Sequence, residues 1–117
     1  MASSLTIEAR LENRETAVVS LVGEVDIANT QEVKNAALKL MSQGARHLVV
    51  DLSRTQYLDS AGLGMLVGLL KRVKERGGKM AVAGVKERVK YVIEITHLDL
   101  VLTLCEDVAT ALKEVEQ

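Results

Sequence analysis

Ser60 lies in the segment of this sequence that gathers the most reactive groups into the fewest residues. The segment, Leu58-Asp59-Ser60-Ala61-Gly62-Leu63-Gly64, holds a hydroxyl, a carboxylate and two glycines. Such groups serve three chemistries: a serine nucleophile, a glycine-rich loop that binds phosphate, and a serine that is itself phosphorylated. The spacing of the residues discriminates among them.

A hydrolase built on Ser60 is disfavoured by its neighbours. Ser60 and Gly62 supply half of the G-x-S-x-G nucleophile elbow, but Leu58 stands where the first glycine should be. A general base is also missing, because neither His47 nor His97 has an evident link to Ser60. We therefore expect that the protein is not an enzyme.

Nucleotide-binding loops fit the glycines only in part. Gly62 and Gly64 begin a dinucleotide fingerprint, but Gly68 comes one residue later than G-x-G-x-x-G requires. No Gly-Lys-Ser/Thr follows, so the segment is not a phosphate-binding P-loop. A small nucleotide-binding module remains an alternative, and we expect no cofactor.

Phosphorylation of Ser60 is the chemistry that the segment accommodates best. We predict that Ser60 is the N-cap of a helix, where backbone amides lack acceptors and the helix dipole favours negative charge. The amides of Ala61, Gly62 and Leu63 would then donate hydrogen bonds to a phosphate on Ser60. The phosphate would bring about −1.5 to −2 charge next to Asp59. The surface would change sign while the fold survived. The alternative is that Ser60 only caps the helix.

A second segment, Gly23-Glu24-Val25-Asp26, follows a predicted strand. Functional loops of α/β proteins gather beyond the carboxyl ends of the strands, so Asp26 is expected to lie near Ser60. It would add a second negative group there. Its other possible role is to support its own loop.

The strands that position these loops are visible as patterns of apolar residues. Residues 5–11 alternate between apolar and polar, which predicts a half-buried strand, and residues 12–15 form a hairpin turn. Residues 16–22 are almost continuously apolar, as in a strand covered on both faces. Residues 54–56 are interpreted as a polar connection. Further strands are predicted over residues 47–52, 79–83 and 101–104.

Four amphipathic stripes predict helices, over residues 33–41, 63–73, 85–96 and 108–115. Asn29 is the expected N-cap of the first, with Glu32 in its first turn, and Gly44 and Gly77-Gly78 follow the first two helices. The element order ββαβαβαβα predicts one α/β domain over residues 1–117. Its sheet of about five strands would be mostly parallel with an antiparallel first hairpin, packed with about four helices.

Composition excludes several classes of function. The 117 residues carry a net charge of −1 and contain no Phe or Trp, which argues against binding to nucleic acid. Cys105 is the only cysteine, so neither a disulfide nor a cysteine-based metal site is expected. No apolar run approaches the length of a membrane span, and no secretory signal is present. We expect a cytoplasmic protein.

The two motifs together resemble those of STAS domains, and specifically of bacterial single-domain anti-sigma factor antagonists. The resemblance rests on Gly23-Glu24-Val25-Asp26, on Asp51-Leu52-Ser53 and on Ser60, which follows Ser53 after six intervening residues. It extends from Leu5 to the last helix. Many relatives carry a second serine where this chain has Ala61. His97 stands where a glycine often ends the third helix, and histidine can adopt a left-handed conformation at some strain.

The resemblance implies a switch between partners. The unphosphorylated protein would bind an anti-sigma factor, a serine kinase of the GHKL ATPase type, and so release the sigma factor. Phosphorylation of Ser60 would end binding, and a PP2C-type phosphatase would restore it. The alternative is that the chain is a STAS component of a larger stress-signalling assembly. We expect the protein to be a monomer. The implied docking surface comprises Asp26, Ile27, Asn29, Thr30, Asp59, Ala61, Gly62 and Leu63.

Overall fold

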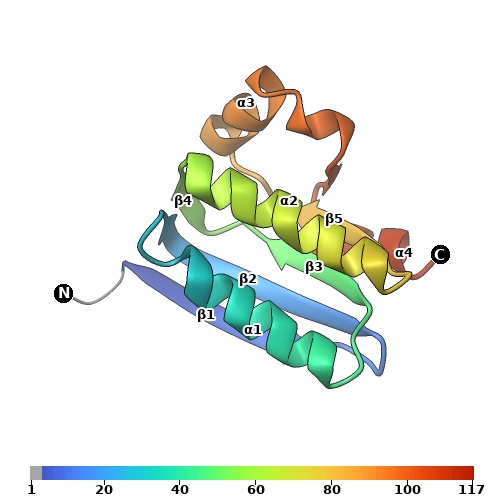
Figure 1. Cartoon of the computed structure of the whole chain (residues 1–117). Helices are drawn as coiled ribbons and strands as arrows, with labels where there is room; N and C mark the ends of the chain where they lie inside the picture. Colours follow the sequence, from blue (N-terminus) through green and yellow to red (C-terminus); the bar gives the residue numbers. More distant parts are fainter. Residues whose placement is uncertain (1–3) are drawn as a thin grey trace.

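The computed structural model describes residues 4–117, which form a six-stranded mixed sheet with helices on both faces (Figure 1). The strands are β1 (Leu5–Leu11), β2 (Thr16–Val25), β3 (His47–Asp51), β4 (Thr55–Leu58), β5 (Met80–Ala83) and β6 (Thr103–Cys105). The helices are α1 (Thr30–Ser42), α2 (Ser60–Glu75), α3 (Glu87–Ile95) and α4 (Val108–Val115), with a short 3-10 helix η1 (Leu98–Leu100). The predicted fold class is confirmed.

The sheet has the strand order β1-β2-β3-β5-β6. β1 and β2 form the predicted antiparallel hairpin, and the other pairs are parallel. β2 is long enough to have two partners on one side, since its first half pairs with β3 and its end pairs with β4. Val25 is opposite Leu58 in that second pairing, which brings the residues that follow the two strands together.

The prediction of a connection over residues 54–56 is wrong, because Thr55 begins β4. The Thr55 hydroxyl donates a hydrogen bond of 2.7 Å to the Leu21 carbonyl of β2, and Gly23 N–H donates to the Arg54 carbonyl. The four residues of β4, Thr-Gln-Tyr-Leu, do not alternate between apolar and polar, so the sequence pattern does not indicate a strand. The strand exists because β2 extends beyond β3 and offers its unpaired backbone groups.

The core lies on both faces of the sheet, as the apolar run of β2 predicts. Leu21, Leu48 and Leu66 belong to the larger cluster, beneath α1, α2 and α3. The smaller cluster includes Val18 and Ala111 and lies between the sheet and α4. Burial of each leucine contributes about 2 kcal/mol, so these clusters hold the helices at fixed positions on the sheet.

The ends of the helices agree with the sequence in most places. Gly44 and Gly77 have positive φ after α1 and α2, and His97 is left-handed at φ 61° after α3. α3 begins at Glu87, two residues later than predicted. Asn29 does precede α1, but its side chain makes no capping hydrogen bond to that helix.

Candidate functional site

Ser60 is exposed and is the first residue of α2, at the carboxyl edge of the sheet. The prediction that it is the N-cap is wrong, because Asp59 occupies that position. Asp59 has an extended backbone, and its side chain accepts a hydrogen bond of 2.9 Å from Gly62 N–H. The cap therefore uses the carboxylate of Asp59 and leaves the hydroxyl of Ser60 out of it.

Asp59 also connects the start of α2 to the loop after β2. Its second carboxylate oxygen accepts a hydrogen bond of 3.2 Å from Ile27 N–H. Its own N–H donates to the Val25 carbonyl at 3.2 Å. One side chain thus holds the two predicted functional loops against each other. Sequence reasoning missed this role, because it depends on the pairing of β2 with β4.

The loop that follows β2 is held by hydrogen bonds of its own. The Asp26 carboxylate accepts a bond of 2.9 Å from Ala28 N–H, and its backbone carbonyl accepts bonds from the amides of Asn29 and Thr30. The Asn29 side chain accepts from Asp26 N–H at 3.0 Å and donates to the Glu24 carbonyl at 2.9 Å. Asp26 therefore supports its own loop, while a docking role stays a prediction.

The predicted docking residues differ widely in exposure. Ile27 is 80% exposed, whereas Asn29, Gly62 and Leu63 are buried. The others are half-buried, namely Asp26, Thr30, Asp59 and Ala61. The buried three would act by shaping the loops, since a partner reaches only exposed groups. Tyr57 of β4, 47% exposed and paired in register with Glu24, was not predicted, because its strand was not.

The glycine after Ser60 is explained by packing. A Cβ on Gly62 would lie 2.6 Å from Leu58 Cδ1 and 3.2 Å from Val25 Cγ1, which is too close. α2 therefore begins in close contact with β2 and β4. Gly64 is exposed, and a Cβ there would meet nothing within 4 Å.

Two of the three amides predicted to donate hydrogen bonds to a phosphate already donate to Asp59. Gly62 N–H donates to the Asp59 carboxylate and Leu63 N–H donates to the Asp59 carbonyl at 3.0 Å. A phosphate on Ser60 would lie beside that carboxylate with few local donors to compensate it. Because Ser60 is exposed, the charge of the phosphate would face the solvent.

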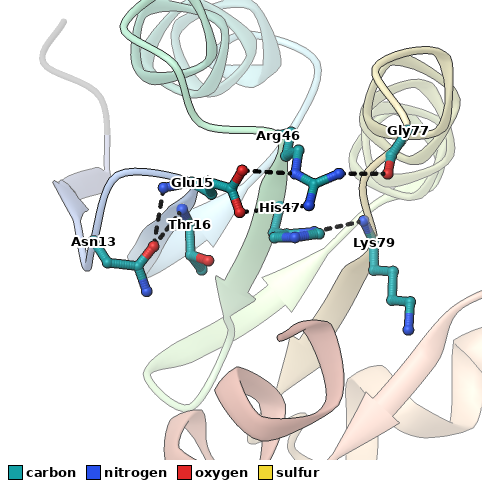
Figure 2. A network of polar contacts seen from close by, with 7 residues as sticks. All are labelled: Asn13, Glu15, Thr16, Arg46, His47, Gly77 and Lys79. Carbon is teal, nitrogen blue, oxygen red and sulfur yellow. Dashed lines mark hydrogen bonds and ion pairs between the residues drawn. The ribbon is translucent and has the colours of Figure 1, made fainter. Parts of the chain in front are cut away.

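A polar network occupies the other end of the sheet, where α2 ends (Figure 2). Arg46 forms an ion pair with Glu15 at 3.2 Å and donates to the Gly77 carbonyl. The buried imidazole of His47 accepts a hydrogen bond of 3.0 Å from Lys79 N–H through Nδ1. Burial, and next the positive charge of Arg46, lower the pKa of His47. The network joins the hairpin to α2 and β5, so its role is structural.

Residues 4–117 contain neither a metal-ligating cluster nor a helix that could span a membrane. No group of three or more His, Cys, Asp or Glu side chains is placed to hold a metal ion. None of the helices described there has the length and apolar character to cross a bilayer.

Comparisons with known proteins agree on one family. The model of the STAS domain matches residues 8–111. An anti-sigma-B factor antagonist of Staphylococcus aureus (strain NCTC 8325 / PS 47) is 32% identical over 80 residues, which are 68% of this chain and 74% of the relative.

Solved structures share the fold. An anti-sigma factor antagonist from Mycobacterium paratuberculosis superposes with a TM-score of 0.85 at 24% identity, over 97% of this chain and 96% of its own. The anti-sigma factor antagonist SpoIIAA in its unphosphorylated form gives 0.82 at 18% identity, over 93% and 95%.

Proposed function

Because this chain belongs to the STAS domain family, we propose that it is an anti-sigma factor antagonist switched by phosphorylation of Ser60. As a single domain over residues 1–117, it binds an anti-sigma factor that is also a GHKL-type serine kinase, and the sigma factor is released. It acts in the cytoplasm and carries no catalytic residue of its own. The observation that supports the proposal best is the exposed Ser60 hydroxyl beside the loop that presents Ile27.

The modification is a transfer of the γ-phosphoryl group of ATP to Ser60 Oγ. A bond forms between Oγ and phosphorus, and the bond from phosphorus to the β–γ bridging oxygen breaks, which releases ADP. The proton of the hydroxyl passes to a base of the kinase. A PP2C-type phosphatase hydrolyses the phosphoserine and returns the protein to its binding form.

The geometry explains why a phosphate would end binding. Ser60 is next to the Asp59 carboxylate, whose presence makes added negative charge unfavourable. The Gly62 and Leu63 amides are already bonded to Asp59, so they offer the phosphate little compensation. An interface over Ser60 and Ile27 would have to desolvate this charge without a partner for it. The affinity therefore falls while the fold is kept.

The nucleotide-binding alternative has less support. Gly62 is accounted for by close packing against Leu58, and its amide is bonded to Asp59. A loop that binds phosphates needs several free amides at one point. The chain as a STAS component of a larger assembly would use the same surface, with a different partner.

The test is to incubate the purified protein with ATP and, in turn, each purified GHKL-type anti-sigma kinase of the source organism. Mass spectrometry is expected to find phosphate on Ser60 with one of them. Ser53 is also exposed, so Ser53→Ala is the matched control and should be phosphorylated normally. Phosphate on Ser53 or Thr55 with Ser60 untouched would contradict the proposal.

A further inference from the structure

α2 presents one exposed strip that begins at Ser60. Gly64, Val67, Lys71 and Lys74 follow Ser60 at intervals of four, three, four and three residues, which places all five on one side of the helix. The five residues are exposed. At 1.5 Å per residue the strip is about 21 Å long. A partner that contacts Ser60 would therefore find the rest of the strip within a single interface, which is commonly about 30 Å across.

A groove of about 490 Å³ adjoins the far half of this strip. The side chains of Val67, Leu70 and Val101 form its apolar part. Val67 is 36% exposed and Val101 is 51% exposed. Its lining residues belong to α2, except for Val101, which directly follows η1. Apolar side chains this exposed at a hollow indicate a binding surface.

The rim of the groove is positively charged. Lys71 and Lys74 line it, and Glu75 is the one acidic side chain among its lining residues. Neither lysine forms an ion pair within residues 4–117. An apolar hollow with two unpaired cations is complementary to an apolar side chain flanked by carboxylates.

We infer that the groove between α2 and Val101 binds an acidic, partly apolar segment of the anti-sigma factor, at the same time as that factor contacts Ser60. The inference rests on the proposed function, which supplies the contact at the start of the strip. A second copy of this chain fits less well, because a two-fold axis through the groove would bring Lys71 and Lys74 of one copy against the same lysines of the other. The added contact raises affinity without touching the site of modification.

The test compares two charge reversals of equal size. In Lys71→Glu/Lys74→Glu the rim becomes acidic, whereas Lys39→Glu/Lys113→Glu changes two exposed lysines on α1 and α4. Calorimetry with the purified anti-sigma kinase should show about a tenfold weaker Kd for the first variant and less than a twofold change for the second. Val67→Ser should also weaken binding, because it removes apolar contact.

Cross-linking identifies what occupies the groove. A carbodiimide joins lysines to carboxylates that touch them, so Lys71 or Lys74 should be linked to acidic residues of the kinase in the complex. Ser60→Asp should weaken binding and reduce these links, in part only, because aspartate carries less charge than phosphate.

The results separate a failure of the groove inference from a failure of the proposed function. If Ser60→Asp binds more weakly while Lys71→Glu/Lys74→Glu binds as tightly as the unmodified protein, the groove inference is wrong and the proposed function stands. Links from Lys71 to another copy of this chain would also overturn the inference. If the unmodified protein binds none of the kinases, both are wrong.

Discussion

At the scale of the residue, Ser60 and Asp59 divide two tasks. Asp59 caps α2 and holds the loop after β2, while Ser60 remains exposed and outside the cap. The Ser60 side chain can therefore change without loss of the hydrogen bonds that hold the loop after β2 against the start of α2. The division explains why a serine here can be a switch without being a structural support.

Ser60→Ala should leave both the fold and the binding intact. The cap belongs to Asp59, and alanine favours helix, so the free energy of unfolding should change by less than about 0.5 kcal/mol. The variant should bind the anti-sigma factor and resist phosphorylation. Urea unfolding and calorimetry measure the two effects. A loss of binding on removal of one exposed hydroxyl would mean that Ser60 is a contact as well as a switch.

Asp59→Ala should be more damaging. It removes the acceptor of the Gly62 and Ile27 amides, so stability should fall by about 1–2 kcal/mol, and the Ile27 amide should exchange its hydrogen faster. Asp26→Asn is the control, since it keeps an oxygen for Ala28 N–H and should change stability by less than about 0.5 kcal/mol. Asp26→Asn is nevertheless expected to impair docking or phosphorylation. Equal stability of the two variants would show that Asp59 does not hold the loops.

At the scale of the element, the start of α2 is defined by how closely the helix approaches the sheet. Gly62 lies where α2 meets Leu58 of β4 and Val25 of β2. Gly68, one and a half turns later, has open space around its missing Cβ. The two glycines have the same helical backbone and opposite surroundings.

Gly62→Ala and Gly68→Ala should therefore change stability in opposite directions. The first forces a methyl group against Leu58 and should destabilise the protein by about 1–3 kcal/mol. The second should stabilise α2 by up to about 1 kcal/mol, because alanine is the better helix former. Thermal unfolding of the pair checks both signs. If Gly62→Ala left the stability unchanged, Leu58 and Val25 would have to move aside more easily than their packing against Gly62 indicates.

At the scale of the whole molecule, the two ends of the sheet differ in role. Ser60 and its loops lie at the carboxyl end of β2 and β4, and the network of Figure 2 closes the other end. That network connects the β1–β2 hairpin to the α2–β5 connection through Arg46 and His47. Changes there should alter stability and leave binding at Ser60 unaffected.

Acid should weaken the fold through His47. The pKa of His47 in the folded protein lies below the ordinary 6.5, because burial and then the positive charge of Arg46 oppose protonation. Lys79 also lowers this pKa. Glu15 and Glu116 raise it, but less than the other causes lower it. As the pH falls, His47 therefore takes up a proton in the unfolded chain at a higher pH than it does in the folded protein. His47 contributes its full stabilisation above about pH 6.5, and this is lost as pH falls toward the folded pKa.

Unfolding measured by urea between pH 7.5 and 5.5 tests this. His47→Gln should reduce the fall in stability over that range. If the unmodified protein and His47→Gln lose stability at the same rate, His47 is not the group that titrates.

The sequence alone determined the fold class, because hydrophobic periods of two and about 3.6 residues and glycines such as Gly44 and Gly77 are local properties of a chain. It also placed Ser60 and Asp26 at the carboxyl ends of strands, since parallel strands end at one edge. Only the tertiary structure decided that Thr55–Leu58 is a strand, that Asp59 joins two loops, and that Leu63 is buried while Ile27 is exposed. Each of these depends on where β2 extends past β3. The pairing of β2 with β4 joins residues about thirty positions apart in the sequence, and no local pattern encodes such a pairing.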